Sequence, residues 1–502
     1  MSTLTGRLST ILKSDRWMAI GLFALGVFSR LPFRSQLLYH WDSVNFALAI
    51  EHFDVRVHQP HPPGTFVLYV MLGRLFNWLL HDPNASLVWI SVLTSGLSAT
   101  LIFVLGKRWF DKRVGLAAAI LMLTSPLIWF HGEIALSYML EFFWVILIVM
   151  LCSSFLRGND KAFLASALCL GLAGGIRPNT PVFLFPLWAI VVFKRKQPIH
   201  KIFAALVVMA IGALLWAIPM VVMSGGPAAY WDIMQWWSNQ HLQRSSQSNP
   251  LFYSARFGIY TLYALGFALG PILWGVYRYR RDLKRSLFGD WRAQLLAFWI
   301  APGAAYFTFV HLRQPGHTFT IMPALIIIAG LATVVVGRDL AKRSPRAGIM
   351  VAALVIGCNS LLFLLGPSNL FGSSRSVFST PTWASIHEYD IDVSNRLKAI
   401  RETFTAEDTT VLAGSRYFRV PDFYLRDYQM PSLSHELNEQ SVILPEHIQT
   451  LVLFSDSVLP QLSTEPFLRL LPLPGGKSMR YATWGEGEKA RLSRDALVIE
   501  KK

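Results

Sequence analysis

Hydrophobic residues along this chain gather in long, nearly uninterrupted runs, which differ from the amphipathic and alternating patterns of water-soluble proteins. A helix that crosses the hydrocarbon core of a bilayer needs about 20 apolar residues, and these runs approach that length. We therefore predict eleven membrane-spanning helices, at residues 17–33, 86–105, 114–130, 139–155, 162–176, 181–193, 202–223, 257–276, 293–310, 319–336 and 349–365.

The long segment between the first two runs has an apolar pattern of its own. Residues 43–52 and 65–80 are predicted to be helices that lie at the membrane interface. The alternative for residues 65–80 is an additional membrane-spanning helix. The fifth and sixth runs are short, and Arg177-Pro178-Asn179 separates them. They are either two short helices that meet near the outer surface or a re-entrant pair, which is tolerated only where protein or a wet cavity surrounds it.

Beyond residue 366 the chain becomes polar, and short alternating runs replace the long apolar ones. Residues 409–413, 417–420 and 450–454 are predicted strands, and 394–404 is a predicted helix. The predicted fold class is a polytopic α-helical membrane protein with a small C-terminal extracytoplasmic α/β domain. We place the transmembrane domain at 1–366 and the α/β domain at 367–502.

The composition agrees with a membrane protein. The chain has 502 residues, of which 53% are hydrophobic and 15% charged, against about 25% charged in soluble domains. The formal net charge of +16 does not indicate nucleic-acid binding, because Lys and Arg concentrate in short loops between the apolar runs. The positive-inside rule then places the N-terminus and these loops on the cytoplasmic side of a bacterial inner or plasma membrane. It places the C-terminal domain on the opposite, outer side.

Two acids fall in the predicted outer loops close to the membrane. Asp42 follows the first apolar run, and Glu133 lies in the short turn between the third and fourth. A carboxylate beside the hydrocarbon is expensive to desolvate and therefore marks a candidate site. Asp42 could instead cap the helix that begins at Ser43, and Glu133 could be a solvated loop carboxylate. We interpret Asp54 in the same first loop as a residue that structures the loop.

Several cations, histidines and aromatic residues accompany these acids on the predicted outer face. Arg177 and Arg313 are placed to meet an anionic headgroup, because a guanidinium presents a planar fork of donors to phosphate; snorkelling to ordinary lipid is the alternative. His58 and His61 are candidates for ligand binding or for hydrogen bonding within their loop. The candidate substrate-binding residues are His58, His61, Tyr138, Trp236, Trp237 and His317. The two tryptophans could equally anchor a helix at the headgroups.

The order of these features resembles the GT-C superfamily of membrane glycosyltransferases, in particular the protein O-mannosyltransferase and aminoarabinose transferase group (glycosyltransferase family 39 type). The resemblance covers about residues 15–200. It rests on the acid after the first run, the His61-Pro62-Pro63 segment, the basic loop at 106–113, the stretch from Ser125-Pro126 to Glu133, and Arg177-Pro178. Members of that group often carry paired acids in the first loop, whereas here Ser43 follows Asp42.

The resemblance implies a glycosyltransferase that moves a sugar from a polyprenyl-phosphate donor to a glycan, lipid or protein acceptor on the outer face. Asp42 would be the catalytic base, Glu133 a second catalytic acid, and Arg177 with Arg313 would bind the donor phosphate. Membrane lipids are the other expected partners; no metal ligand set is predicted, and a divalent cation remains open. The alternatives are a transporter or flippase for a lipid-linked sugar and a membrane-anchored scaffold.

Overall fold

The computed structural model describes residues 14–246, 250–310, 314–342, 344, 346–366, 381–429, 442–455, 468–492 and 497–501. The chain divides into two compact units. One, the helical unit, comprises Met1–Arg34 and Ala49–Ser385; the other, the C-terminal unit, comprises Ser35–Leu48 and Ile386–Lys502. The predicted domain boundary at 366/367 borders residues 367–380, which lie outside the described residues, and it stays a prediction.

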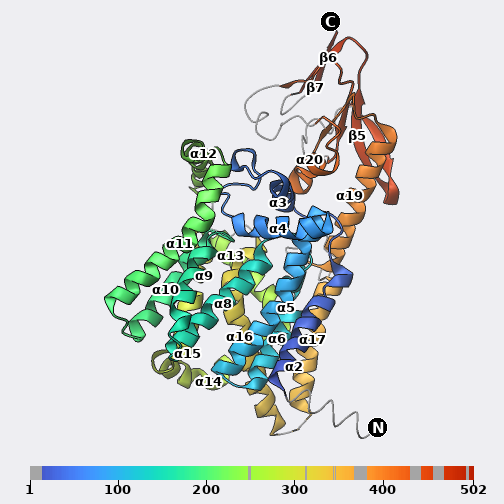
Figure 1. Ribbon diagram of the computed structural model, residues 1–502. Helices are drawn as coiled ribbons and strands as arrows, with labels where there is room; N and C mark the ends of the chain where they lie inside the picture. Colours follow the sequence, from blue (N-terminus) through green and yellow to red (C-terminus); the bar gives the residue numbers. More distant parts are fainter. Residues whose placement is uncertain are drawn as a thin grey trace. The chain divides into compact units, whose positions relative to one another are not determined.

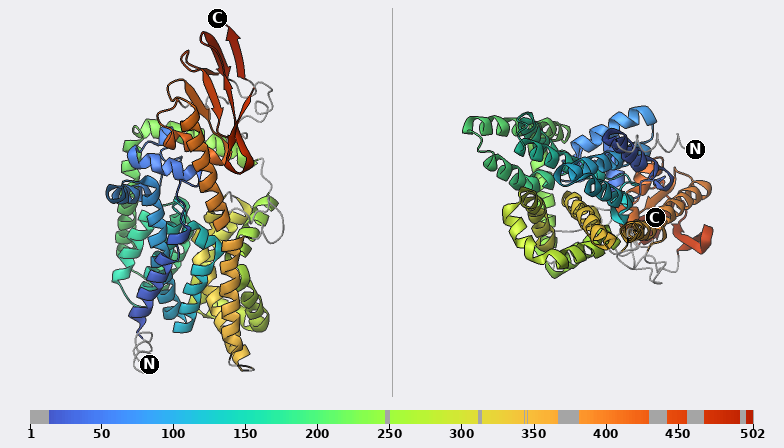
Figure 2. Two further views of the ribbon diagram at one scale, coloured as in Figure 1. Left: turned by 90° about the vertical axis from the view of Figure 1, so that its right-hand side faces the viewer. Right: turned by 90° about the horizontal axis from the view of Figure 1, so that it is seen from below.

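Every one of the eleven predicted runs coincides with helix in the helical unit. Its α-helices are α2 (Asp15–Phe28), α4 (Val67–Leu80), α5 (Pro83–Trp109), α6 (Lys112–Thr124), α7 (Pro126–His131), α8 (Tyr138–Leu156), α9 (Lys161–Ala173), α10 (Asn179–Lys194), α11 (Ile199–Met223), α12 (Pro227–Ser246), α13 (Pro250–Leu265), α14 (Leu269–Gly289), α15 (Trp291–Phe309), α16 (Met322–Ala341) and α17 (Ala347–Leu365). Helices such as α2, α5, α6 and α17 run lengthwise through the unit (Figures 1 and 2).

Six helical stretches among the described residues are long and apolar enough to cross a membrane. They are Pro83–Trp109, Tyr138–Leu156, Ile199–Met223, Leu251–Arg281, Met322–Ala341 and Ala347–Leu365. Shorter apolar helices at Val67–Leu80, Lys161–Ala173 and Asn179–Lys194 accompany them. The protein is therefore an integral membrane protein, while eleven crossings remain a prediction.

Two of the predicted spans are broken by residues that interrupt helical hydrogen bonding. α6 ends at Thr124 and α7 restarts at Pro126, because proline lacks the N–H that would continue the helix. Between α13 and α14, Gly266 has φ +51°. The Asn359 amide repairs this break, since its Oδ1 accepts a hydrogen bond from the Phe267 N–H (2.8 Å) and its Nδ2 donates to the Leu265 carbonyl (3.3 Å).

The long segment after α2 contains both predicted helices, α3 (Trp41–Glu51) and α4, with the short 3-10 helix η2 (Val55–Val57) between them. With 14 residues, α4 is too short for an upright crossing, and it lies crosswise to α5 and α8 (Figure 1). Arg74 of α4 donates hydrogen bonds to the carbonyls of Ile50 (2.8 Å) and Ala49 (3.1 Å) at the end of α3.

The C-terminal unit is mixed α/β, as predicted. Helix α19 (Trp383–Thr403) precedes a four-stranded sheet of order β1-β3-β5-β4, in which β1 (Thr409–Leu412) and β3 (Thr450–Leu453) are parallel. The antiparallel strands β5 (Lys477–Thr483) and β4 (Arg469–Leu473) complete it. A second sheet has the order β2-β6-β7, with β2 (Val442–Ile443), β6 (Glu488–Leu492) and β7 (Leu497–Lys501).

One predicted strand of this unit is wrong. Residues 417–420 fall on the 3-10 helix η5 (Ser415–Tyr417) and the start of α20 (Val420–Tyr424). Arg419 adopts a left-handed conformation with φ +64°, and Pro421 occupies the first turn of α20. Proline is favoured in a first helical turn because its missing N–H has no partner there. The alternating pattern was therefore overridden by local backbone geometry.

Candidate functional site

Asp42 lies in the first turn of α3, one residue after the helix begins at Trp41. It is therefore not the N-cap, although the positive end of the helix dipole still favours its negative charge. Its backbone N–H donates to Nδ1 of His40 (3.1 Å), and its Oδ2 lies 3.4 Å from the same nitrogen. Burial lowers the pKa of His40, with the charge of Asp42 opposing the shift.

The segment that carries Asp42 is fastened to α19 by one half-buried carboxylate. Asp390 accepts hydrogen bonds from the Ser35 hydroxyl (3.0 Å), the Gln36 N–H (2.8 Å) and the Leu37 N–H (3.1 Å). Leu38 is fixed as well, because its N–H donates to the Tyr424 hydroxyl (2.9 Å). The C-terminal unit thus positions the backbone that leads into α3.

A cation from the C-terminal unit reaches the same helix. Arg419 donates from Nη1 to Oδ1 of Asn45 (2.9 Å), and its Nε lies 3.1 Å from Asp422. Asn45 is three residues after Asp42, so the two share one face of α3. Sequence reasoning missed Arg419, since about 370 residues separate it from α3 and it lies in a run predicted to be a strand. No local pattern around Arg419 could have indicated this contact.

Glu133 is fully buried beside Arg30, so the interpretation as a solvated loop carboxylate is wrong. Burial raises the pKa of the Glu133 carboxyl well above its usual value, and the positive charge of Arg30 opposes that shift. Arg30 donates to the Leu123 carbonyl (2.9 Å), and its guanidinium lies over the Trp129 ring (4.8 Å). Gly132 permits this approach, because a Cβ there would lie 3.1 Å from the Arg30 Nε.

Arg177, the predicted phosphate ligand, is held in an ion pair with a buried carboxylate. Its Nε lies 3.2 Å from Oε2 of Glu141, its Nη1 donates to the Ser137 hydroxyl (3.3 Å), and its guanidinium stacks 4.2 Å from the Tyr138 ring centre. Glu141 in turn accepts from the hydroxyls of Thr180 (2.6 Å) and Thr320 (3.0 Å). Glu141 is therefore a partner of Arg177, whereas the sequence indicated an interfacial residue or a partner of Glu133.

Three further candidates join this Arg177 cluster through aromatic contacts. Tyr138 donates its hydroxyl to the Gln314 side chain (2.6 Å), and its ring lies 6.0 Å from that of His317. Phe66 bridges to the first loop, because it lies 5.9 Å from the Arg177 guanidinium and 4.9 Å from the His61 ring. Arg177, Tyr138, His317 and His61 thus form one connected group.

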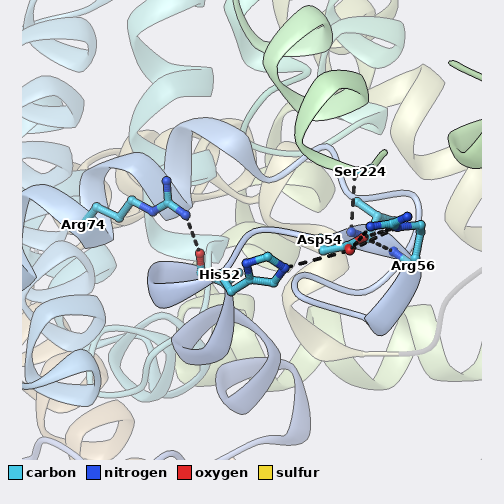
Figure 3. A network of polar contacts seen from close by, with 7 residues as sticks. His52, Asp54, Arg56, Arg74 and Ser224 are labelled. Atoms are coloured by element: carbon cyan, nitrogen blue, oxygen red, sulfur yellow. Dashed lines mark hydrogen bonds and ion pairs between the residues drawn. The ribbon is translucent and has the colours of Figure 1, made fainter. Parts of the chain in front are cut away.

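His58 and Trp236 meet elsewhere, at a tight hairpin in the first loop. Asp54 and Gln59 exchange backbone hydrogen bonds (2.6 and 2.9 Å), and the His58 ring lies 5.7 Å from Trp236 of α12. Asp54 accepts hydrogen bonds from the backbone N–H and the guanidinium of Arg56, with Nη2 at 2.7 Å, while His52 lies 3.9 Å away (Figure 3). Burial favours a higher pKa for Asp54, but the Arg56 bonds outweigh it and lower that pKa. Asp54 structures the loop, as predicted.

The hairpin is also joined to the end of α11. The Val55 N–H donates to the Ser224 hydroxyl (3.4 Å; Figure 3), and Gly225 has φ +88° and lies against the Arg56 guanidinium. The Tyr230 hydroxyl of α12 donates to the Pro63 carbonyl (2.9 Å). Helix α12 therefore covers the hairpin, with Trp236 39% exposed and Trp237 half-buried.

The structure leaves some predicted residues apart from these groups. Arg313 lies outside the described residues. Asp42 belongs to the C-terminal unit, whereas Glu133 and Arg177 belong to the helical unit. Within the described part of the chain, no group of three or more His, Cys, Asp or Glu side chains is arranged to hold a metal ion.

Comparison with known proteins adds evidence from outside the chain. A family model described as dolichyl-phosphate-mannose-protein mannosyltransferase matches residues 60–222. Over these residues the chain is similar to that mannosyltransferase family. The matched region contains Glu133, Glu141 and Arg177, whereas Asp42 and the hairpin at Asp54–Gln59 precede it.

A curated relative of this chain is the undecaprenyl phosphate-alpha-4-amino-4-deoxy-L-arabinose arabinosyl transferase of Edwardsiella ictaluri (strain 93-146). It is 25% identical over 322 residues, which cover 60% of this chain and 55% of that relative. The crystal structures of ArnT from Cupriavidus metallidurans, bound to undecaprenyl phosphate and in the apo state, are similar with TM-scores of 0.58 and 0.56. Each is 14% identical, and the matches cover 95% of this chain and 98% of ArnT, which establishes a shared fold.

Proposed function

We propose that this protein transfers a sugar from a polyprenyl-phosphate donor to a hydroxyl or amine acceptor on the outer face of the membrane. The observation that carries the proposal is the setting of Asp42: a carboxylate in the first turn of α3, beside the His40 ring, on a segment fixed by hydrogen bonds to Asp390. The curated arabinosyl transferase and the mannosyltransferase family model support the reaction class.

The chemistry needs a base and a stabilised leaving group. Asp42 removes the proton of the acceptor hydroxyl or amine as that atom attacks the anomeric carbon. The bond between the anomeric carbon and the phosphate oxygen breaks in the same step, and its electron pair leaves with the polyprenyl phosphate. Positive charge near that phosphate lowers the barrier. A single displacement inverts the anomeric configuration.

Arg177 is proposed as the group that meets the donor phosphate, with Arg313 as its helper. The Tyr138 ring and the Glu141 carboxylate hold the Arg177 guanidinium in one orientation, so little side-chain freedom is lost when an anion binds. Glu141 reduces the net charge of the site, and the arriving phosphate therefore competes with a carboxylate for the same guanidinium. A rigidly oriented Arg177 with moderate affinity for phosphate suits the reaction, because the polyprenyl phosphate product must also leave the site.

Glu133 is proposed as a second acid that works in its protonated form. Its buried position raises its pKa and so favours the protonated form, and a protonated carboxyl donates a hydrogen bond and is a poor base or metal ligand. A neutral carboxyl beside Arg30 can bind an acceptor oxygen. Asp42 would then act as the base and Glu133 as a hydrogen-bond donor, because the two carboxyl groups lie in different environments.

A deletion strain tests the proposed function. Mass spectrometry of its lipids and envelope glycans should show accumulation of a polyprenyl-phosphate sugar together with loss of that sugar from one glycan, lipid or protein. Complementation with the full chain should reverse both changes. Unchanged levels of every lipid-linked sugar and every envelope glycan would contradict the proposal.

A further inference from the structure

A groove of about 520 Å³ lies between α6, α16 and α17, and none of the residues proposed for catalysis lines it. On α6 its lining begins at Arg113 and ends at Leu121, and on α16 it begins at Thr333 and ends at Ala341. Each of these stretches advances by eight residues, which corresponds to about 12 Å of helix. One leaflet of the hydrocarbon core is about 15 Å deep. The groove therefore extends through most of one leaflet.

The walls of the groove are apolar and fixed in place. Leu116, Ile120, Ile349 and Ile356 line it, and the Thr333 hydroxyl is already donated to the Ala329 carbonyl of its own helix (2.8 Å). The helices on both sides touch through small residues. A Cβ at Gly330 would lie 2.7 Å from the Ala118 nitrogen of α6.

Where α17 touches α16, a Cβ at Gly348 would lie 2.8 Å from the Gly337 carbonyl oxygen. Such close backbone contacts give a preformed groove between packed helices.

One end of the groove is cationic. Arg113 and Arg338 line it there, and both are exposed. Arg338 pairs with Asp111, which also caps α6 by accepting from the N–H groups of Arg113 and Val114. Among the described residues, the Arg113 guanidinium makes no ion pair.

Two more charged pairs lie near the cationic end. Lys342 pairs with Asp339 (3.2 Å) on α16, and Lys112 lies 3.3 Å from Asp15. Arg346 directly precedes α17 and is exposed. Positive charge therefore exceeds negative charge at this end of the groove.

We propose that this groove is a binding site for an anionic glycerophospholipid of the leaflet that contains the basic loops. The phosphate contacts Arg113 and Arg338, and one acyl chain lies along α6, α16 and α17. An apolar channel one leaflet deep with guanidinium groups at its membrane-surface end matches the shape and charge of such a lipid. A soluble sugar would find no hydroxyl partners along these walls.

The groove is distinct from the proposed donor site. Arg113 lies in the first turn of α6, and the chain must pass through α6 and α7 before it reaches Glu133. The proposed lipid therefore binds near the opposite membrane surface. Its binding does not depend on the proposed transferase activity.

Photo-crosslinking tests the proposal. The full-length protein would be placed in phosphatidylcholine vesicles that contain a trace of phosphatidylglycerol with a photoreactive acyl chain, and labelled peptides would be mapped by mass spectrometry. We expect labelling on α6, α16 and α17. The Arg113→Gln, Arg338→Gln double variant should lose labelling by about fivefold for each arginine. Ala352→Trp, which fills the groove, should also abolish it.

Matched variants separate a built site from general lipid contact. Arg280→Gln removes an exposed arginine of α14 that does not line the groove, and Ala353→Trp adds an indole at the neighbouring exposed position of α17. Both should label like the unaltered protein. Equal labelling by a phosphatidylcholine probe, no effect of the double variant, or stronger competition by undecaprenyl phosphate than by phosphatidylglycerol would each overturn the proposal.

Discussion

At the scale of single residues, the charges inside this protein are paired in ways that fix their geometry. Glu141 holds Arg177, and Asp392 accepts from three donors in the C-terminal unit. Removing one partner of a buried pair leaves the other charge desolvated, which costs more than the pair itself contributes. Substituting one partner of such a pair is therefore expected to change the stability of the protein measurably.

Glu141→Gln should destabilise the protein strongly. The glutamine keeps an oxygen for Thr180 and Thr320, but the Arg177 guanidinium loses its counter-charge. The expected cost is about 3–5 kcal/mol, seen as a lower thermal unfolding midpoint of the purified protein in detergent. Asp232→Asn, at an exposed position of α12, is the control and should leave the midpoint unchanged. An unaltered midpoint for Glu141→Gln would show that the pair does not form.

Asp392 should make the stability of the C-terminal unit depend on acid. Burial favours a higher pKa for Asp392, but hydrogen bonds from Tyr417, Lys477 and Arg396 outweigh it and hold that pKa at about 2. A depressed pKa stabilises the fold above the unfolded value of 3.8, and this contribution of about 2 kcal/mol is lost as the pH falls from 4 to 2.

Hydrogen exchange of the β3 and β5 amides in the full chain measures this effect. Protection of these amides, measured against their intrinsic exchange rates at each pH, should fall from pH 4 to pH 2 in the unaltered protein. In Asp392→Asn the protection should already be lower at neutral pH and should change less on acidification. An identical acid dependence in both proteins would exclude Asp392 as its source.

At the scale of helices and strands, the sequence predicted most of the helical unit because long apolar runs have one stable conformation in a bilayer. All eleven runs fall on helix. It could not predict the breaks repaired by tertiary contacts, such as Asn359 at Gly266, nor the helical turn at 417–420. The partner of the segment around Asp42 was also beyond reach, because Asp390 lies more than 350 residues away and nothing local pairs it with Gln36.

That anchoring of the Asp42 segment is itself testable. Asp390→Ala removes the acceptor of two backbone N–H groups and one hydroxyl. Amide exchange at Gln36 and Leu37 should rise by about tenfold or more, since a hydrogen bond to a carboxylate is worth about 1.5–3 kcal/mol. The transfer rate should fall because the backbone before α3 is released. Glu388→Ala, an exposed acid on the same helix, is the control. Unchanged exchange at both amides would refute the anchoring.

At the scale of the whole molecule, the proposed reaction on the outer face requires the C-terminal unit to lie outside the cell and the basic loops to lie inside it. The two possible orientations in the membrane would bury the same apolar helices. Only the distribution of charged residues between the two sides distinguishes them. The basic groups near the lipid groove and the exposed arginines of α14 belong to the predicted inner side.

Cysteine labelling in intact spheroplasts measures the orientation. With Cys152, Cys169 and Cys358 replaced by alanine, Glu486→Cys places an exposed thiol in the C-terminal unit and Arg280→Cys places one on α14. A membrane-impermeant maleimide should label the first without lysis and the second only after lysis. The reverse pattern would invert the topology and would place the proposed acceptor site in the cytoplasm.

The most direct measurement is the initial rate of sugar transfer by purified Asp42→Asn with the donor that accumulates in the deletion strain. The isosteric amide cannot accept the acceptor's proton, so the rate should fall by about 10²–10⁴-fold. Binding of polyprenyl phosphate should persist, and Asp232→Asn should transfer at the unaltered rate. Transfer by Asp42→Asn at the rate of the unaltered protein would contradict the assignment of Asp42 as the base and, with it, the proposed mechanism.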